Sequence, residues 1–278
     1  MMQRLEMDQI RQWLPNREND HNTTKRDYGQ VLLIGGSAGM GGSIIMSAEA
    51  VVHAGAGLTT VATDSNHHTA LHSRLPEAMA LPLQDLAGIS ERIKKSTVVA
   101  IGPGLGLDER AVNVFRIVLA SIRDHQILIL DADALTLLAR EKSKLRTEHV
   151  ILTPHAGEWK RLTGLEPDEQ IDEQNQRWAK DLGATVVLKG DETRIYTSEE
   201  SYLNIKGTPA MATGGMGDCL TGCIAGLCAQ SEDALPGVLS AVYMHSYIGR
   251  ELAENQHIIR PTQIAEALPV YLKKLTHM

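Results

Sequence analysis

The sequence predicts an α/β fold with a mainly parallel central sheet flanked by helices on both faces. Short β-branched apolar runs alternate with longer segments of helical periodicity along most of the 278 residues, as expected for repeated β-α units. Glycines, acids, a histidine or a lysine follow most of these runs. Because ligands bind beyond the carboxyl ends of the strands in such sheets, these clusters are the candidate functional positions.

The N-terminal part of the chain contains the first strand, loop and helix. We expect a short helix over 8–14, ended by Pro15, and a polar loop over 16–27. An apolar run at 31–34 predicts a buried strand, which leads into the glycine-rich segment 35–43 and a helix. This layout is typical of nucleotide sites, although the glycine spacing does not match G-x-G-x-x-G in its usual frame.

The remaining strands and helices follow the same alternation. Strands are expected at 58–62, 97–101, 127–130, 150–152, 185–188, 194–197 and 202–205. Helices are expected over 44–52, 112–122, the segment that contains Trp159, 170–182, 216–230, 233–253 and 261–273. The sequence shows no internal repeat and no interdomain linker, so we expect one domain over 1–278.

Several predicted strands end in residues that suit a ligand site. These ends carry Gly102–Gly106, Asp131 and Asp133, Thr153–Glu158, and Lys189–Asp191. Each cluster alone has an ordinary explanation, with glycines as turns, the two acids as helix caps and His155 as a satisfied loop residue. Their repetition at the same edge of one sheet favours a functional site.

The most unusual stretch is Gly214-Gly215-Met216-Gly217-Asp218, which immediately precedes a predicted helix. Glycine destabilises helices and strands, so three glycines in four positions indicate a special backbone conformation or the close approach of another group. A helix N-terminus offers N–H groups and a positive dipole end to an anion. Asp218 is then either the N-cap of the helix or a catalytic base beside a bound phosphate. No Lys-Ser or Lys-Thr follows the last glycine, so the segment is not a P-loop.

The composition excludes several classes of protein. A net charge of −7 argues against general nucleic-acid binding. The three cysteines, at 219, 223 and 228, fall within one predicted helix and indicate core residues in a reducing compartment. No apolar run has the roughly 18 residues of a membrane span, and the mixed-charge N-terminus lacks the features of a signal or transit peptide. We therefore expect a cytoplasmic protein that binds neither nucleic acid nor membranes.

Six motifs taken together resemble the ADP/ATP-dependent NAD(P)H-hydrate dehydratase family, which has a ribokinase-like fold. They are GGSAGMGGSIIMSAEAVVHAGAGLTTVAT, IGPGLG, DADAL, LTPHAGEW, VVLKGDETRI and NIKGTPAMATGGMGDCLTGCIAGLCAQ. The resemblance runs in order from about residue 28 to residue 260. The GGMGD segment by itself occurs across ribokinase-like kinases, and the combination of motifs is much more specific.

The resemblance implies an enzyme that repairs hydrated NADH or NADPH. In this family a nucleotide, ADP or ATP, phosphorylates the hydroxyl at C6 of the S epimer, and elimination of phosphate restores the double bond. Mg²⁺ and a homotetramer are also implied. No epimerase domain precedes this one, so we expect a separate protein to act on the other epimer.

The resemblance also implies roles for individual residues. Asp218 would be the base, with the amides of Gly215 and Gly217 holding the transferred phosphate. The expected nucleotide-binding residues are Lys189, Gly190, Asp191, Glu192, Thr193 and Gly217. The expected contacts of the hydrated dinucleotide are Ser43, Gly106, His155 and Asp218, and the family often has Ala where this chain has Ser43.

Two of the implied residues keep a simpler alternative. Glu158 is the candidate for organising Mg²⁺ through water, but it could be only a first-turn helix acid favoured by the dipole. Lys189 could bind a phosphate of the nucleotide, or it could simply be a solvated residue at the end of a strand.

Three alternative functions remain open at this point. A ribokinase-like kinase of a vitamin precursor, such as hydroxyethylthiazole kinase, would share the glycines and the acid. A non-catalytic dinucleotide sensor would have no need of Asp218, and a dehydrogenase would need a better G-x-G-x-x-G segment.

Overall fold

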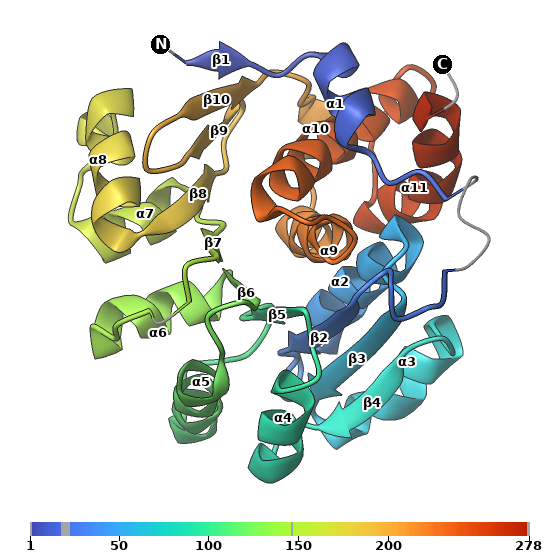
Figure 1. The fold of residues 1–278 in the computed structure, drawn as a ribbon, viewed down its shortest axis with the longest axis vertical. Helices are drawn as coiled ribbons and strands as arrows, with labels where there is room; N and C mark the ends of the chain where they lie inside the picture. The colour runs from blue at the N-terminus through green and yellow to red at the C-terminus, as the bar shows by residue number, and fades with distance from the viewer. Residues whose placement is uncertain (1, 18–22, 146, 277–278) are drawn as a thin grey trace.

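The computed structural model describes residues 2–17, 23–145 and 147–276. Its strands are β1 (Gln3–Arg4), β2 (Gln30–Ile34), β3 (Leu58–Thr63), β4 (Met79–Pro82), β5 (Val98–Ile101), β6 (Ile127–Leu130), β7 (Val150–Leu152), β8 (Ala184–Leu188), β9 (Thr193–Tyr196) and β10 (Ser201–Asn204). They form one ten-stranded sheet in the order β1-β10-β9-β8-β7-β6-β5-β2-β3-β4. Strand β9 runs antiparallel to β8 and β10, and the other neighbouring pairs are parallel. Figure 1 shows β1 and β4 at opposite ends of this sheet.

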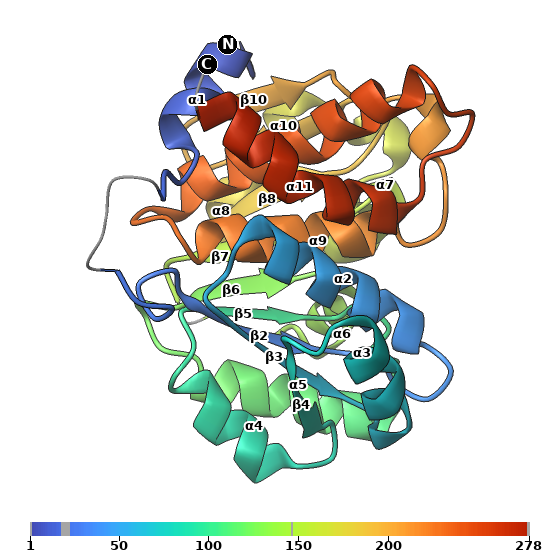
Figure 2. The same ribbon diagram turned by 90° about the vertical axis from the view of Figure 1, so that its right-hand side faces the viewer.

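Helices cover both faces of the sheet (Figure 2). The α-helices are α1 (Met7–Trp13), α2 (Gly41–Ala54), α3 (His68–Arg74), α4 (Leu86–Ile93), α5 (Glu109–Ser121), α6 (Asp133–Glu141), α7 (Ala156–Thr163), α8 (Asp172–Leu182), α9 (Met216–Cys228), α10 (Ala234–Ala253) and α11 (Pro261–Thr276). Short 3-10 turns lie at Ser65–His67, Pro167–Glu169 and Pro209–Met211. Buried residues of α1, α2, α3, α9, α10 and α11 share one core, and those of α4 to α8 share the other.

Strand residues alternate between these two cores because successive side chains point to opposite faces of a sheet. In β2, for example, Val31 and Leu33 belong to the first core and Leu32 and Ile34 to the second. A strand that is buried on both faces needs apolar residues at every position and not only at alternate ones, which explains the continuous apolar run in the sequence.

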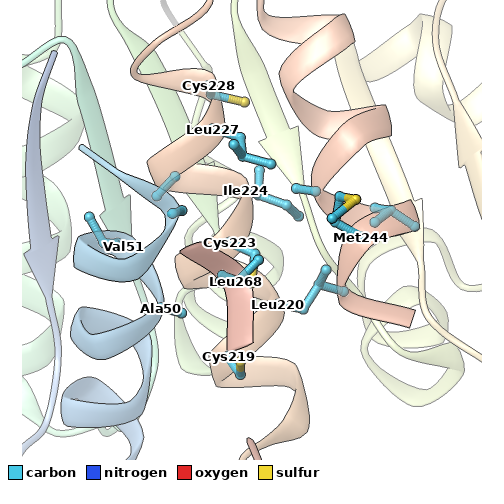
Figure 3. Packing of buried hydrophobic residues seen from close by; sticks show 14 of the residues in the cluster. Ala50, Val51, Cys219, Leu220, Cys223, Ile224, Leu227, Cys228, Met244 and Leu268 are labelled. Carbon is cyan, nitrogen blue, oxygen red and sulfur yellow. The ribbon is translucent and has the colours of Figure 1, made fainter. Parts of the chain in front are cut away.

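Helices α2 and α9 lie side by side, with Ala50 and Val51 of α2 near the buried residues of α9 (Figure 3). A Cβ placed on Gly222 would lie 2.2 Å from the carbonyl oxygen of Ser47, and one on Gly226 would lie 2.6 Å from Cβ of Ala54. The glycines at 222 and 226 therefore form a small-residue face of α9 that allows the two helix backbones to approach closely. This contact fixes the start of α9 relative to the glycine-rich loop that precedes α2.

The predicted strands and helices are confirmed, with ends displaced by one to a few residues. Helix α8 was expected to begin at residue 170, but Ile171 is extended, with φ of −78° and ψ of 158°, so the helix begins at Asp172. Strands β1 and β4 and helices α3, α4 and α6 were not predicted; β4 is short and ends in Pro82, so its sequence lacks a strong strand pattern. The expected loop over 16–27 lies partly outside the described residues.

The three cysteines of α9 are free and buried, as the sequence predicted. Among the described residues, no helix combines the length and the apolar character that crossing a membrane requires.

Candidate functional site

Two glycine-rich loops lie side by side at the carboxyl ends of β2 and β5. The N–H of Gly36 donates to the carbonyl of Pro103 at 2.9 Å, and the N–H of Ser37 donates to the carbonyl of Gly104 at 2.6 Å. Gly106 has a φ of 84°, and its N–H donates to Oδ2 of Asp133 at 2.8 Å. A left-handed backbone conformation of this kind favours glycine, which explains why the loop after β5 ends in Gly106.

The start of α9 requires Gly215 for two reasons. Gly215 has a φ of 88°, and a Cβ at this position would lie 2.2 Å from Cε of Met46. Gly215 is the N-cap, with no side-chain cap, so Asp218 is the third residue of the helix and the interpretation of Asp218 as the N-cap is wrong. The first-turn amides, which include that of Gly217, have no acceptor within the helix and are available to an anion.

The carboxylate of Asp218 is largely buried among charged neighbours. Burial, followed by the negative charge of Asp131, raises the pKa of Asp218 to about 6. A hydrogen bond from the hydroxyl of Ser43 and the positive charge of Lys189 act in the opposite direction, and Asp133 adds to the rise. A carboxyl group with a pKa near neutral is suited to take up and release a proton at physiological pH.

Lys189 follows β8 and is held against the start of α9. Its Nζ lies 2.8 Å from Oδ1 of Asp131, and a Cβ placed on Gly217 would lie 3.3 Å from the same Nζ. Burial lowers the pKa of Lys189, but the charges of Asp131, Glu158 and Asp218 together outweigh it, so the pKa is raised and the ammonium group stays charged. The interpretation of Lys189 as a solvated strand end is wrong, because its side chain is only 20% exposed.

His155 and Glu158 form a reciprocal cap at the start of α7. Nδ1 of His155 accepts from the N–H groups of Gly157 and Glu158, which places the proton of the neutral ring on Nε2. Glu158 is buried, and its Oε2 accepts from the N–H of His155 at 2.8 Å. The first-turn role of Glu158 is therefore observed, and its role toward Mg²⁺ stays a prediction.

A cavity of about 610 Å³ lies beside these residues. It is lined by Lys189, Gly190, Asp191, Thr193, Gly207, Thr208, Pro209, Met211, Ala212, Met216, Gly217, Leu220, Val242, His245 and Ser246. This volume is in the usual range for small-molecule sites, and five of the six predicted nucleotide-binding residues line it. The exception is Glu192, which is exposed and whose Oε2 lies 3.1 Å from Nη2 of Arg194.

The predicted contacts of the hydrated dinucleotide lie outside this cavity but close to Asp218. Ser43 donates to the Asp218 carboxylate, and Gly106 binds Asp133, whose charge acts on Asp218. His155 pairs with Lys189 as an isolated bridge between the ends of β7 and β8. Ser43 thus contacts Asp218 directly, whereas Gly106 and His155 are each linked to it through one intermediate residue, Asp133 and Lys189.

Sequence analysis placed Asp131 and Asp133 among the strand-end clusters that favour a site, with helix caps as the alternative, but it assigned neither residue a role in the reaction. Asp131 is bound to Lys189 and to Thr221, and Asp133 holds the backbone of Gly106. The signal was present, because two acids directly follow a buried strand at the edge where ligands bind.

The arrangement suits the transfer of a phosphoryl group to a hydroxyl. Amides at a helix start and a charged lysine can hold the transferred phosphate, and a carboxylate beside them can accept the proton of the attacking hydroxyl. The adjoining cavity leaves room for the nucleotide that donates the phosphate.

The chain matches known proteins over nearly its whole length. A family model described as NAD(P)H-hydrate dehydratase matches residues 31–270. An ADP-dependent (S)-NAD(P)H-hydrate dehydratase of Listeria monocytogenes is 47% identical over 261 residues, which are 94% of this chain and 93% of that protein. A protein of the same name from Staphylococcus aureus is 44% identical over 262 residues, which are 94% of each chain.

Solved structures give the same result. A ribokinase-like superfamily protein of Enterococcus faecalis V583 superposes with a TM-score of 0.97 at 41% identity and covers 100% of this chain and 97% of its own. An ADP/ATP-dependent NAD(P)H-hydrate dehydratase of Bacillus subtilis, co-crystallized with ATP/Mg²⁺, superposes with a TM-score of 0.87 at 31% identity and covers 99% of both chains.

A hydroxyethylthiazole kinase of Pyrococcus horikoshii OT3 has a TM-score of 0.59 at 12% identity, so it shares the fold alone. The dehydratase matches extend over the strand-end loops and the start of α9, where the candidate site lies. The chain therefore belongs to the NAD(P)H-hydrate dehydratase family and has its ribokinase-like fold.

Proposed function

We propose that this protein is an ADP-dependent (S)-NAD(P)H-hydrate dehydratase that restores NADH or NADPH from the S epimer of the C6 hydrate. The observation that carries the proposal is the carboxylate of Asp218, raised in pKa to about 6, beside the glycine-rich start of α9 and the ammonium group of Lys189. The full-length similarity to the dehydratase of Listeria monocytogenes supports the choice of substrate and of ADP as phosphoryl donor.

The reaction divides into two steps. In the first, Asp218 takes the proton of the C6 hydroxyl, the hydroxyl oxygen bonds to the terminal phosphorus of ADP, and the bond from that phosphorus to AMP breaks. The amides of Gly215 and Gly217 and the ammonium group of Lys189 stabilise the charge on the transferred phosphoryl oxygens. In the second, the bond from C6 to the phosphate oxygen breaks, a proton leaves the neighbouring ring carbon, and the double bond forms.

The two ligands would lie on either side of Asp218. The nucleotide would occupy the 610 Å³ cavity, with Lys189, Gly190, Asp191, Thr193 and Gly217 around its phosphates and Glu192 at the rim. The hydrated ring would lie against the loops that carry Ser43, Gly106 and His155. This placement leaves the C6 hydroxyl between the base and the phosphate that it attacks.

Magnesium fits the residues of this site when the nucleotide supplies most of its ligands. Among the described residues, no three His, Cys, Asp or Glu side chains gather as a metal-binding group. Mg²⁺ commonly keeps several waters and binds phosphate oxygens with one or two carboxylates, so such a group is not required. Glu158 would contact the ion through water, and bound Mg²⁺ would neutralise charge on the transferred phosphate.

We further propose that the chain acts in the cytoplasm as a single catalytic domain that forms a homotetramer. A separate epimerase would convert the R epimer of the hydrate into the S epimer. The family resemblance supports these three proposals.

The stoichiometry of the products tests the proposed function against a kinase of the same fold. A dehydratase should release one AMP and one phosphate for each NADH formed from the hydrate. A vitamin-precursor kinase should instead phosphorylate hydroxyethylthiazole and accumulate a stable phosphate ester. Formation of that ester without any NADH would contradict the proposal.

A further inference from the structure

Asp131 is a buried carboxylate at the centre of the site that neither transfers a proton nor binds a phosphate in the reaction proposed above. It follows β6, and its side chain is 2% exposed. Oδ1 accepts from Nζ of Lys189 at 2.8 Å, and Oδ2 accepts from Oγ1 of Thr221 at 2.7 Å. One carboxylate thus joins the ends of β6 and β8, across β7, to helix α9.

The position of Thr221 places Asp131 on the reacting side of α9. Thr221 is three residues after Asp218 and four after Gly217, so the three residues lie on the same face of the helix. The carboxylate that accepts from Thr221 therefore lies one helical turn below the base and the phosphate-binding amide. The bond at Oδ2 fixes the direction in which Oδ1 holds the lysine.

A lysine in this place needs such a restraint. Its ammonium group is a compact charge on a flexible four-carbon chain, and the charges of Asp131, Glu158 and Asp218 all act on it. Direct pairing of Lys189 with Asp218 would occupy the oxygen that must accept a proton. The bond to Asp131 holds the ammonium group beside Gly217 and leaves Asp218 free to bind the substrate hydroxyl.

We propose that Asp131 is a positioning residue that fixes the ammonium group of Lys189 beside the amide of Gly217, where it faces the transferred phosphate. The identity of that phosphate rests on the proposed function. The alternative is that Asp131 only joins β6 to α9 and stabilises the fold. The two roles differ in one property, because a positioning residue acts through Lys189 and a structural one does not.

A double-mutant cycle on ADP binding separates these roles. Lys189→Ala should weaken the affinity for ADP roughly tenfold, and Asp131→Asn should weaken it several-fold because the ammonium group is no longer held in place. The double variant Asp131→Asn/Lys189→Ala should bind ADP as Lys189→Ala does. Titration calorimetry on the full chain in the presence of Mg²⁺ measures all four affinities.

Asp133→Asn is the matched control. It removes one negative charge from the same region, but Asp133 binds the backbone of Gly106 and not Lys189. The fold-changes in ADP affinity caused by Asp133→Asn and by Lys189→Ala should therefore multiply in the double variant. If Asp131→Asn and Lys189→Ala also multiply, or if Asp131→Asn leaves the affinity within twofold of the parent, the positioning role is wrong.

Thr221→Val keeps the test decisive if Asp131→Asn does not fold. This variant retains both charges and removes only the hydrogen bond to Oδ2, and it should give a smaller loss that disappears in the Lys189→Ala background. A loss that persists in that background would contradict the proposal. Since ADP binding is measured without hydrated dinucleotide, a lack of dehydratase turnover would overturn the proposed function and not this inference.

Discussion

Asp218 combines burial with neighbouring charge so that its carboxylate titrates close to neutral pH. Burial and Asp131 raise its pKa to about 6, against the hydrogen bond from Ser43 and the charge of Lys189. Only the ionised form can accept the proton of the substrate hydroxyl, so the pH dependence of the reaction should report this group.

The rate of dehydration should therefore fall as the pH drops below about 6, by about tenfold per pH unit. Ser43→Ala removes a bond that favours the ionised form, so it should move this acid limb to higher pH. The pH profile of kcat for the parent and Ser43→Ala checks both statements. An acid limb that stays in place in the variant would show that Ser43 does not act on the base.

The raised pKa of Asp218 also lowers the stability of the folded protein, by an amount that depends on pH. The folded pKa of about 6 lies above the ordinary 3.8, so ionisation of Asp218 opposes folding at neutral pH. The Asp218→Asn variant should be as stable as the parent below about pH 4, become relatively more stable between about pH 4 and 6, and be more stable than the parent by about 3 kcal/mol above pH 6. Urea unfolding across this range measures the difference, and an Asn variant less stable than the parent at pH 8 would contradict the account.

At the scale of elements, the contact between α2 and α9 sets the position of the base. The small-residue face of α9 allows the backbones of the two helices to approach closely, because Gly222 lies against the carbonyl oxygen of Ser47. Gly222→Ala places a methyl group where a backbone oxygen lies, and should destabilise the protein by about 1–3 kcal/mol.

Gly42→Ala in α2 provides the control for that substitution. A Cβ at Gly42 meets no heavy atom within 4 Å, so this change should be neutral or stabilising by up to about 1 kcal/mol. Thermal unfolding of the two variants gives the comparison. If the two variants changed the stability equally, the absence of a side chain at Gly222 would not be needed for the contact between α2 and α9.

The elements and the site were predictable to different degrees for physical reasons. Buried strands and glycine-rich loops were found because each requires an unusual local sequence, such as three glycines before Asp218. The role of Asp131 was not predictable, because its two partners lie 58 and 90 residues away along the chain. Only the folded sheet brings such residues together.

At the scale of the whole molecule, the apolar residues of the C-terminal helices give little support for an assembly. Val242, Met244, Ile248, Ile264 and Leu268 of α10 and α11 are buried within the chain and are not available to a partner subunit. The proposal of a homotetramer therefore stands on the family resemblance. Light scattering should give about four times the 30.3 kDa chain mass, and a monomer mass independent of concentration would contradict it.

The most direct test of the central claim is the recovery of NADH from its S hydrate, followed by absorbance in the presence of ADP and Mg²⁺. The parent should restore NADH only when ADP is present. Asp218→Asn should bind the dinucleotide but turn it over on the order of 10²–10⁴-fold more slowly, because Asn cannot accept the proton. Near-normal turnover by the Asn variant, or no recovery of NADH by the parent, would contradict the claim that Asp218 is the base of an ADP-dependent dehydratase.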